Sequence, residues 1–230
     1  MTTPLIQVQG LKKYFKTSRG MLHAVDNINL SINKGETLGV VGESGCGKST
    51  LGRVIVRLLE ATEGKVLFDG QNVLEYNGKN LKKMRKTMQI IFQDPYSSLN
   101  PRKSIGDIIS EPIKVNKILM DRISIERRVK ELMETVGLSQ RQINTYPHEL
   151  DGGRRQRVGV ARALSVNPKF IVCDEPVSAL DVSIQAQILN LLMDLQEDHG
   201  LTYLFITHDL SVVKHISNEI AVMYLGQCIE

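Results

Sequence analysis

The sequence contains no tryptophan, only three cysteines, and no apolar run close to the roughly 18 to 20 residues that a membrane-spanning helix needs. The spacings of Cys46, Cys173 and Cys228 fit neither a disulfide framework nor a zinc site. The N-terminal segment lacks a basic start followed by an apolar stretch and a small-residue cleavage site, so we expect no export signal. These absences predict a cytoplasmic protein that does not itself cross a membrane.

Positive charge is the second compositional feature, with a formal net charge of +4. Basic residues cluster at 79–86, 102–103 and 154–157. Clusters of this kind are typical of solvated faces and of anion handling near a phosphate site. Because a single domain with few aromatic residues shows no base-reading module, we expect no nucleic-acid partner.

The order of apolar patterns predicts one α/β unit, for which 230 residues are sufficient. Short strand patterns dominate the first third, and a helical pattern covers 104–146, where Val129, Leu132, Met133 and Val136 recur at helical spacing before Gly137. Strand and helix then alternate, which favours parallel βα units. The expected strands are 6–9, 28–32, 37–41, 66–68, 90–92, 169–173, 203–206 and 220–225, with a helix at 182–199.

A glycine-rich segment follows the apolar strand pattern at 37–41 and precedes a helical stretch beginning near Thr50. It has the P-loop pattern, in which glycines let backbone N–H groups surround a phosphate. Lys48 is expected to reach the β and γ oxygens of the nucleotide, and Ser49 to bind Mg²⁺. The predicted phosphate-binding residues are Gly42, Ser44, Gly45, Cys46, Gly47, Lys48, Ser49 and Thr50.

Polar side chains follow two further apolar strand patterns. Asp174 and Glu175 come at the end of the first, and His208 follows the second. Asp174 suits the Mg²⁺ shell, and Glu175 suits a general base for the water that attacks the γ-phosphate. His208 is expected to contact the γ-phosphate and to orient Glu175 and the water, because strand tips in an open parallel sheet line the ligand crevice.

These motifs, in their order and spacing, resemble the nucleotide-binding domains of ABC transporters across essentially the whole chain. The P-loop is followed by Gln93, by Leu-Asp-Gly-Gly-Arg at 150–154, by Asp174 and Glu175, by Ser-Ala-Leu-Asp at 178–181, and by His208. The resemblance implies an α/β P-loop NTPase (RecA-like) core with a mostly parallel sheet, an N-terminal antiparallel β subdomain and an inserted helical subdomain. Residues 1–94 and 166–230 would form the core with its β subdomain, and about 95–165 the helical subdomain.

The same resemblance implies several roles. Gln93 would bind Mg²⁺ and sense the membrane partner, and Asp181 would lie across a dimer interface. Asp151, Gly152 and Gly153 would complete the ATP site of a second ATPase subunit. Tyr14 would stack on adenine, with Phe15 as the competing candidate; a base on an aromatic face gains about 1 to 3 kcal/mol.

Two local strings resemble the oligopeptide, dipeptide and nickel permease branch: Phe-Gln-Asp-Pro-Tyr-Ser-Ser-Leu-Asn-Pro at 92–101 and Tyr-Pro-His-Glu-Leu at 146–150. The resemblance implies an ATPase that binds ATP and Mg²⁺ and powers an importer. Its partners would be a second ABC ATPase, identical or different, two transmembrane permease subunits and, indirectly, a solute-binding protein. The protein would be peripheral, at the cytoplasmic face of the cell membrane.

The sequence departs from the family pattern at its signature, usually Leu-Ser-Gly-Gly-Gln, where Asp151 and Arg154 replace serine and glutamine. An ionised aspartate still caps a helix, but at about 5 Å from a phosphate charge it would cost on the order of 3 kcal/mol at an effective dielectric constant of 20. One hypothesis is a heterodimer in which the site using this signature is tuned or weakened. The other is a harmless variant in which Arg154 neutralises Asp151.

Members of this branch generally continue beyond the last strand pattern of this sequence, so we do not expect the C-terminal extension of the branch here. A truncated chain and a shorter relative would account for this equally well. Two other functions compete with the transporter motor. A soluble ABC-type ATP-dependent clamp or factor usually carries paired domains or long coiled-coil inserts, and a small-molecule kinase has no use for Gln93 or for Gly152 and Gly153.

Overall fold

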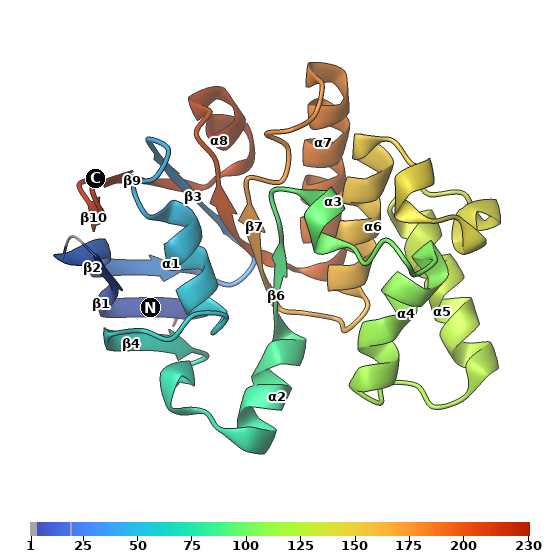
Figure 1. Ribbon diagram of the computed structural model, residues 1–230, viewed down its shortest axis with the longest axis horizontal. Coiled ribbons are helices and arrows are strands. Elements are labelled where there is room, and N and C mark those ends of the chain that lie inside the picture. Colours follow the sequence, from blue (N-terminus) through green and yellow to red (C-terminus); the bar gives the residue numbers. More distant parts are fainter. Residues whose placement is uncertain (1–3, 19) are drawn as a thin grey trace.

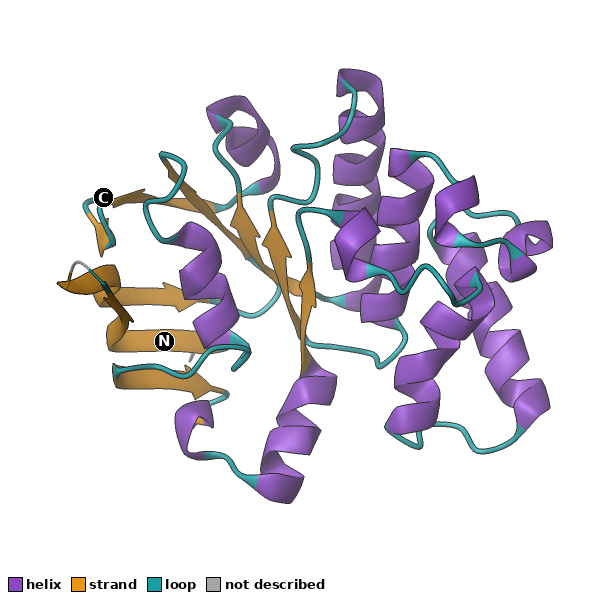
Figure 2. Cartoon of the chain, in the orientation of Figure 1, coloured by secondary structure: helices purple, strands orange, loops and turns teal. Residues whose placement is uncertain are grey.

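The computed structural model describes residues 4–18 and 20–230. The first three residues, which start the segment where we expect no export signal, lie outside the described residues. Within the described part, no helix has both the length and the apolarity needed to cross a membrane. Figure 2 shows a strand-rich side and a helix-rich side, as the change of pattern after residue 104 predicts.

A four-stranded antiparallel sheet forms one side of the molecule, in the order β2-β1-β4-β5. Its strands are β1 (Ile6–Thr17), β2 (Gly20–Ile32), β4 (Glu63–Phe68) and β5 (Gln71–Asn72). The first strand is much longer than the predicted 6–9, because register shifts between Val8 and Tyr14 absorb the break in alternation around Gly10. The expected antiparallel β subdomain is confirmed.

The second sheet has the order β10-β9-β3-β8-β7-β6. Its strands are β3 (Thr37–Gly42), β6 (Met88–Ile91), β7 (Phe170–Asp174), β8 (Thr202–Ile206), β9 (Glu219–Tyr224) and β10 (Gln227–Cys228). All neighbours are parallel except β10 with β9. Since parallel strands end at one edge, the segments after β3, β6, β7 and β8 meet there.

Helices cover this sheet: α1 (Lys48–Ile55), α2 (Gly78–Thr87), α7 (Val182–His199) and α8 (Leu210–Ile216). The predicted helix 182–199 is confirmed, and Gly200 ends it with φ 61°. Helix α8 packs closely on β3, where a Cβ on Gly39 would lie 2.0 Å from Val213 Cγ2. A side chain at this position would therefore push α8 off the sheet.

The helical region lies between β6 and β7 and makes up the right side of Figure 1. It comprises α3 (Pro95–Ser98), α4 (Ile105–Val115), α5 (Arg122–Thr135), α6 (Gly152–Leu164) and the short 3₁₀ helices η2 (Gln140–Asn144) and η3 (Pro147–Glu149). Another 3₁₀ helix, η1 (Val73–Glu75), lies outside this region, before α2. The four predicted core positions of α5, Val129 to Val136, are all buried. Gly137 ends the run with φ 69°, as expected.

The parallel sheet separates two hydrophobic cores. Ile171 and Cys173 of β7 face a core shared with the helical region, whereas Phe170 and Val172 face a core shared with α1 and the antiparallel sheet. The helical region thus shares its core with the sheet. The predicted boundaries of the helical subdomain, at about residues 95 and 165, stay a prediction.

Candidate functional site

A tight loop joins β3 to α1 at the carboxyl edge of the parallel sheet. Gly42, Gly45 and Gly47 have φ values of 154°, 82° and 108°, a region that disfavours other residues. A Cβ on Gly47 would lie 1.9 Å from the Ala24 carbonyl oxygen. The glycines are therefore required by geometry, as the P-loop pattern predicts.

Lys48 is folded back over this loop and is only 4% exposed. Its Nζ donates hydrogen bonds to the carbonyl oxygens of Gly42 at 2.7 Å and Glu43 at 2.8 Å, and the Cys46 sulfur lies 3.9 Å away. These bonds hold a positive charge at the mouth of the loop.

Helix α1 begins directly after the loop, two residues earlier than predicted. Its N-cap is Gly47, and within the described chain no side chain caps it, so its first backbone N–H groups remain available for an anion. A pocket of about 550 Å³ opens over this helix end. The loop residues that line it are Ser44, Gly45, Gly47, Lys48, Ser49 and Thr50, whereas the predicted Gly42 and Cys46 are not part of its lining.

Asp174 lies at the end of β7 and is 1% exposed. The Ser49 hydroxyl donates to its Oδ1 at 2.6 Å, and a guanidinium nitrogen of Arg53 lies 3.4 Å from its Oδ2. A hydroxyl and a carboxylate oxygen thus converge next to the phosphate loop. They are hard oxygen ligands of the kind that Mg²⁺ prefers.

Two polar side chains approach one carboxylate oxygen of Glu175. Glu175 Oε2 accepts a hydrogen bond from Gln93 Nε2 at 3.0 Å and lies 3.2 Å from His208 Nδ1. Glu175 has φ 47°, unusual for this residue type, and its backbone N–H bonds to the Ile206 carbonyl oxygen. The segments after β6, β7 and β8 are therefore brought together at the pocket, where all three side chains are found.

The aromatic wall of the pocket bears on the choice between Tyr14 and Phe15. Phe15 lines the pocket with Leu22 and Ala24, and Phe15 pairs with Leu22 across β1 and β2. Tyr14 is the residue before Phe15 in β1, so its side chain points to the other face of the strand. The structure favours Phe15 over Tyr14 as the partner for a base.

Tyr14 instead belongs to a cluster beside the pocket. Its hydroxyl donates to Asp26 Oδ1 at 2.5 Å, and its ring stacks on His23 with 3.9 Å between centroids. This hydrogen bond raises the pKa of Tyr14 and lowers that of Asp26. The contacts with Asp26 and His23 hold the Tyr14 side chain outside the lining of the nucleotide pocket.

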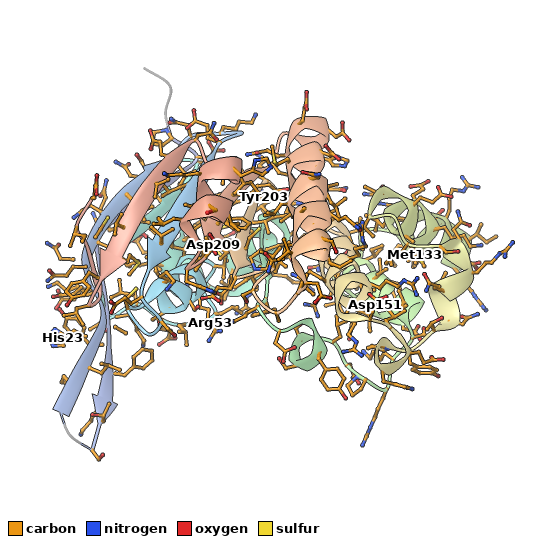
Figure 3. The ribbon with its side chains drawn as sticks, turned by 90° about the horizontal axis from the view of Figure 1, so that it is seen from above. His23, Arg53, Met133, Asp151, Tyr203 and Asp209 are labelled. Atoms are coloured by element: carbon orange, nitrogen blue, oxygen red, sulfur yellow. The ribbon has the colours of Figure 1, made fainter. Side chains whose placement is uncertain are left out.

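The signature segment lies apart from this pocket, at the start of α6. Asp151 caps the helix by accepting a hydrogen bond from the Arg154 N–H at 2.8 Å, and its other oxygen lies 3.4 Å from Arg154 Nε. Both side chains are more than half exposed, at 61% and 55%. Figure 3 labels Arg53 on the strand-rich side and Asp151 on the helical side.

Gly152 and Gly153 form the first turn of α6 and pack against the segment that carries Asp181. A Cβ on Gly153 would lie 2.6 Å from Ile184 Cγ2, and Asp181 is exposed at the N-cap of α7. Of the described residues that line the nucleotide pocket, none comes from 150–154 or 178–181. These predicted residues therefore lie apart from the pocket, with Asp151 and Asp181 exposed and Gly153 buried against Ile184.

Two other features of the structure were not expected. Arg53 reaches Asp174 from α1, and its place four residues after Ser49, on the same helix face, was the available signal. A second cavity of about 580 Å³ lies among α4, α5 and η2. Because its lining includes none of the phosphate-loop residues, we assign the nucleotide chemistry to the smaller pocket.

The chain is similar to known ATP-binding proteins of transporters. A family profile described as "ABC transporter" matches residues 25–178. The chain is 56% identical to the "Oligopeptide transport ATP-binding protein OppF" of Bacillus subtilis, with 100% of this chain and 76% of the relative covered. It is 51% identical to the "Dipeptide transport ATP-binding protein DppF" of Haemophilus influenzae, with 99% and 71% covered.

A solved structure has the same architecture. It is the dimeric, post-hydrolysis state of the ATP-binding cassette MJ0796 bound to ADP and Pi, with a TM-score of 0.89 and 30% identity. The alignment covers 98% of this chain and 97% of that one. The P-loop NTPase fold with a mostly parallel sheet and an antiparallel β subdomain is confirmed.

Proposed function

The chain belongs to the ABC transporter family as an ATP-binding and ATP-hydrolysing subunit, and we propose that it powers an importer of oligopeptides or dipeptides. The observation that carries its ATPase role is one pocket of about 550 Å³ that Lys48 and Glu175 line, with Asp174 bonded to the lining residue Ser49. The names of the relatives at 51–56% identity support the peptide cargo. A soluble clamp is not favoured by these relatives.

The phosphate loop binds and orients the nucleotide. The uncapped N-terminus of α1 and the Lys48 ammonium supply positive potential for the β- and γ-phosphates. Phe15 and Leu22 would supply an apolar wall for the base in the same pocket that the phosphate loop lines. Base stacking of this kind is sequence-tolerant, so the wall contributes affinity more than discrimination.

Ser49 and Asp174 would hold Mg²⁺. Bound there, the ion would neutralise charge that develops on the phosphates during transfer. In the described part of the chain no group of three or more His, Cys, Asp or Glu side chains could hold a metal. Phosphate oxygens and water would therefore complete the Mg²⁺ shell, and Gln93 as a further ligand stays a prediction.

Glu175 acts as the general base in this proposal. Its Oε2 is oriented by Gln93 and by His208, which leaves the carboxylate directed at the pocket and able to accept a proton from water. The buried thiol of Cys173 lies beside it in sequence, but burial raises the pKa of that thiol far above neutrality. Cys173 therefore has no role as a nucleophile.

A second ATPase subunit would complete the site. Asp151 and Asp181 are exposed, Gly152 is half-buried and Gly153 is buried, and all four lie outside this chain's own pocket, which suits a segment that serves the pocket of a partner. The ion pair between Asp151 and Arg154 supports the hypothesis that Arg154 neutralises the aspartate. The competing hypothesis, a heterodimer with one tuned site, predicts a change of rate when the aspartate is replaced.

Two permease subunits would dock beside Gln93, at the cytoplasmic face of the membrane. Tyr96 of α3, three residues after Gln93, is 53% exposed, and its ring lies 5.1 Å from the Arg155 guanidinium. An exposed aromatic side chain of this kind suits a protein interface. Through the permeases, the chain would respond indirectly to a solute-binding protein.

The test is reconstitution of the chain in liposomes with candidate permease subunits, the second ATPase and the solute-binding protein. We expect ATP hydrolysis to rise when peptide-loaded binding protein is added, together with peptide uptake. Binding protein loaded with a non-peptide solute is the control. Stimulation by nucleic acid without any permease would instead support the soluble-factor alternative.

A further inference from the structure

Arg53 is a charged residue at the nucleotide site that the mechanism above does not use. It lies in the last turn of α1, on the same helix as the phosphate-loop lysine. Ser49 and Arg53 are four residues apart and therefore share one face of the helix. That face is directed at the end of β7.

Ser49 and Arg53 each contact a different oxygen of the Asp174 carboxylate. The Ser49 hydroxyl donates to Oδ1 at 2.6 Å, and Arg53 Nη2 lies 3.4 Å from Oδ2. Asp174 is 1% exposed, so its charge is removed from water and needs a compensating partner. In the described part of the chain, Arg53 is the cation paired with it.

The contact is nevertheless easy to release. The Arg53 side chain is 45% exposed, and a single nitrogen makes the contact at a distance near the limit for a hydrogen bond. Arg57, one turn on, provides a contrast, because its Nη1 donates at 2.9 Å to three carbonyl oxygens, those of Val73, Leu74 and Tyr76. Arg57 is fixed in the fold, whereas Arg53 can swing into solvent.

We propose that Arg53 is a positioning residue that competes with Mg²⁺ for Asp174. It holds the buried carboxylate in place and compensates its charge before the nucleotide arrives, and it gives way when the divalent ion binds. This inference rests on the proposed role of Ser49 and Asp174 as Mg²⁺ ligands. Its consequence is that Arg53 weakens the binding of Mg²⁺ at the site and prevents occupation by the ion when no nucleotide phosphates add to its shell.

The sign of the effect follows from the geometry. A guanidinium bound to Oδ2 and a divalent cation on the same carboxylate repel each other, so removing Arg53 removes a competitor. Arg53 does not line the nucleotide pocket, so binding of nucleotide without metal changes far less. A residue that only supported the fold would not produce this pattern.

The experiment measures ADP binding to the purified chain by calorimetry while free Mg²⁺ is titrated, starting from EDTA. In Arg53→Gln and Arg53→Met we expect the Mg²⁺ concentration for half-saturation to fall about 2- to 5-fold, the size expected for a half-exposed ion pair. Arg53→Lys, which keeps the charge, should remain closer to the wild type. Arg127→Gln, at an exposed position of α5, controls for net charge.

Asp174→Asn separates the two claims. If this variant loses the Mg²⁺ dependence of ADP binding, the assignment of the metal site stands and the Arg53 variants test the competition alone. If it keeps that dependence, the proposed metal site itself is wrong. An unchanged or raised half-saturating Mg²⁺ concentration in Arg53→Gln and Arg53→Met would overturn the competition, as would failure of both variants to fold, which would make Arg53 a structural support.

Discussion

The nucleotide pocket and the signature segment differ in how their polar groups are used. At the pocket, Gln93 and His208 both approach one oxygen of Glu175, and side chains from three strand ends act on a common point. At the signature, Asp151 and Arg154 pair with each other at more than half exposure. The first region pairs its polar groups within the chain around one point, whereas the second directs its charged groups outward, as the proposed composite site requires.

The largest effect should come from the nucleotide pocket. Lys48→Ala removes a 4% exposed ammonium held by two carbonyl oxygens, and with it the charge aimed at the phosphates. We expect ATP turnover to fall by at least about a hundredfold. Steady-state ATPase measurements test this, with Lys79→Ala on exposed α2 as the matched lysine control. Full activity in Lys48→Ala would show that the phosphate site lies elsewhere.

A smaller effect should separate the two neighbouring aromatic residues of β1. Phe15→Ala removes the wall of the pocket and should weaken ATP binding by about 5- to 100-fold, the range for loss of one stacked base. Tyr14→Ala should change ATP affinity much less, because Tyr14 contacts Asp26 and His23. Equilibrium binding of ATP to both variants decides between them, and a larger loss in Tyr14→Ala would restore the original expectation.

The smallest effect on this chain's own pocket should come from the signature. Asp151→Ser should leave ATP affinity of the isolated chain within about twofold of the wild type, since the exposed side chain lies outside the pocket. In the assembled transporter, an unchanged ATPase rate would support neutralisation by Arg154. A faster rate would support a tuned heterodimer, and reduced ATP affinity of the isolated chain would contradict the separation of the two regions.

Sequence patterns predicted that the phosphate loop, the two acids and His208 lie at the ends of strands, because each depends on local order: a buried strand, then polar residues at its tip. The choice of Phe15 over Tyr14 depended on the cross-strand register with Leu22, which the broken alternation around Gly10 conceals. The contact of Arg53 with Asp174 joins residues 121 positions apart. Such a contact requires the strand order of the sheet, which no local pattern contains.

The most direct test of the composite account is the mass of the Glu175→Gln chain in solution, measured by light scattering with ATP and Mg²⁺, alone and mixed with the second ATPase subunit. We predict a dimer that requires ATP, because hydrolysis no longer opens it. Adding Gly152→Asp should abolish the dimer, because it places a negative charge where the partner's phosphates would bind. The fold and ATP binding should be kept, since the nearest neighbour of a Cβ at Gly152 is the tip of the flexible Leu180 side chain at 3.0 Å. A dimer that persists with Gly152→Asp, or no ATP-dependent dimer in either mixture, would contradict the account.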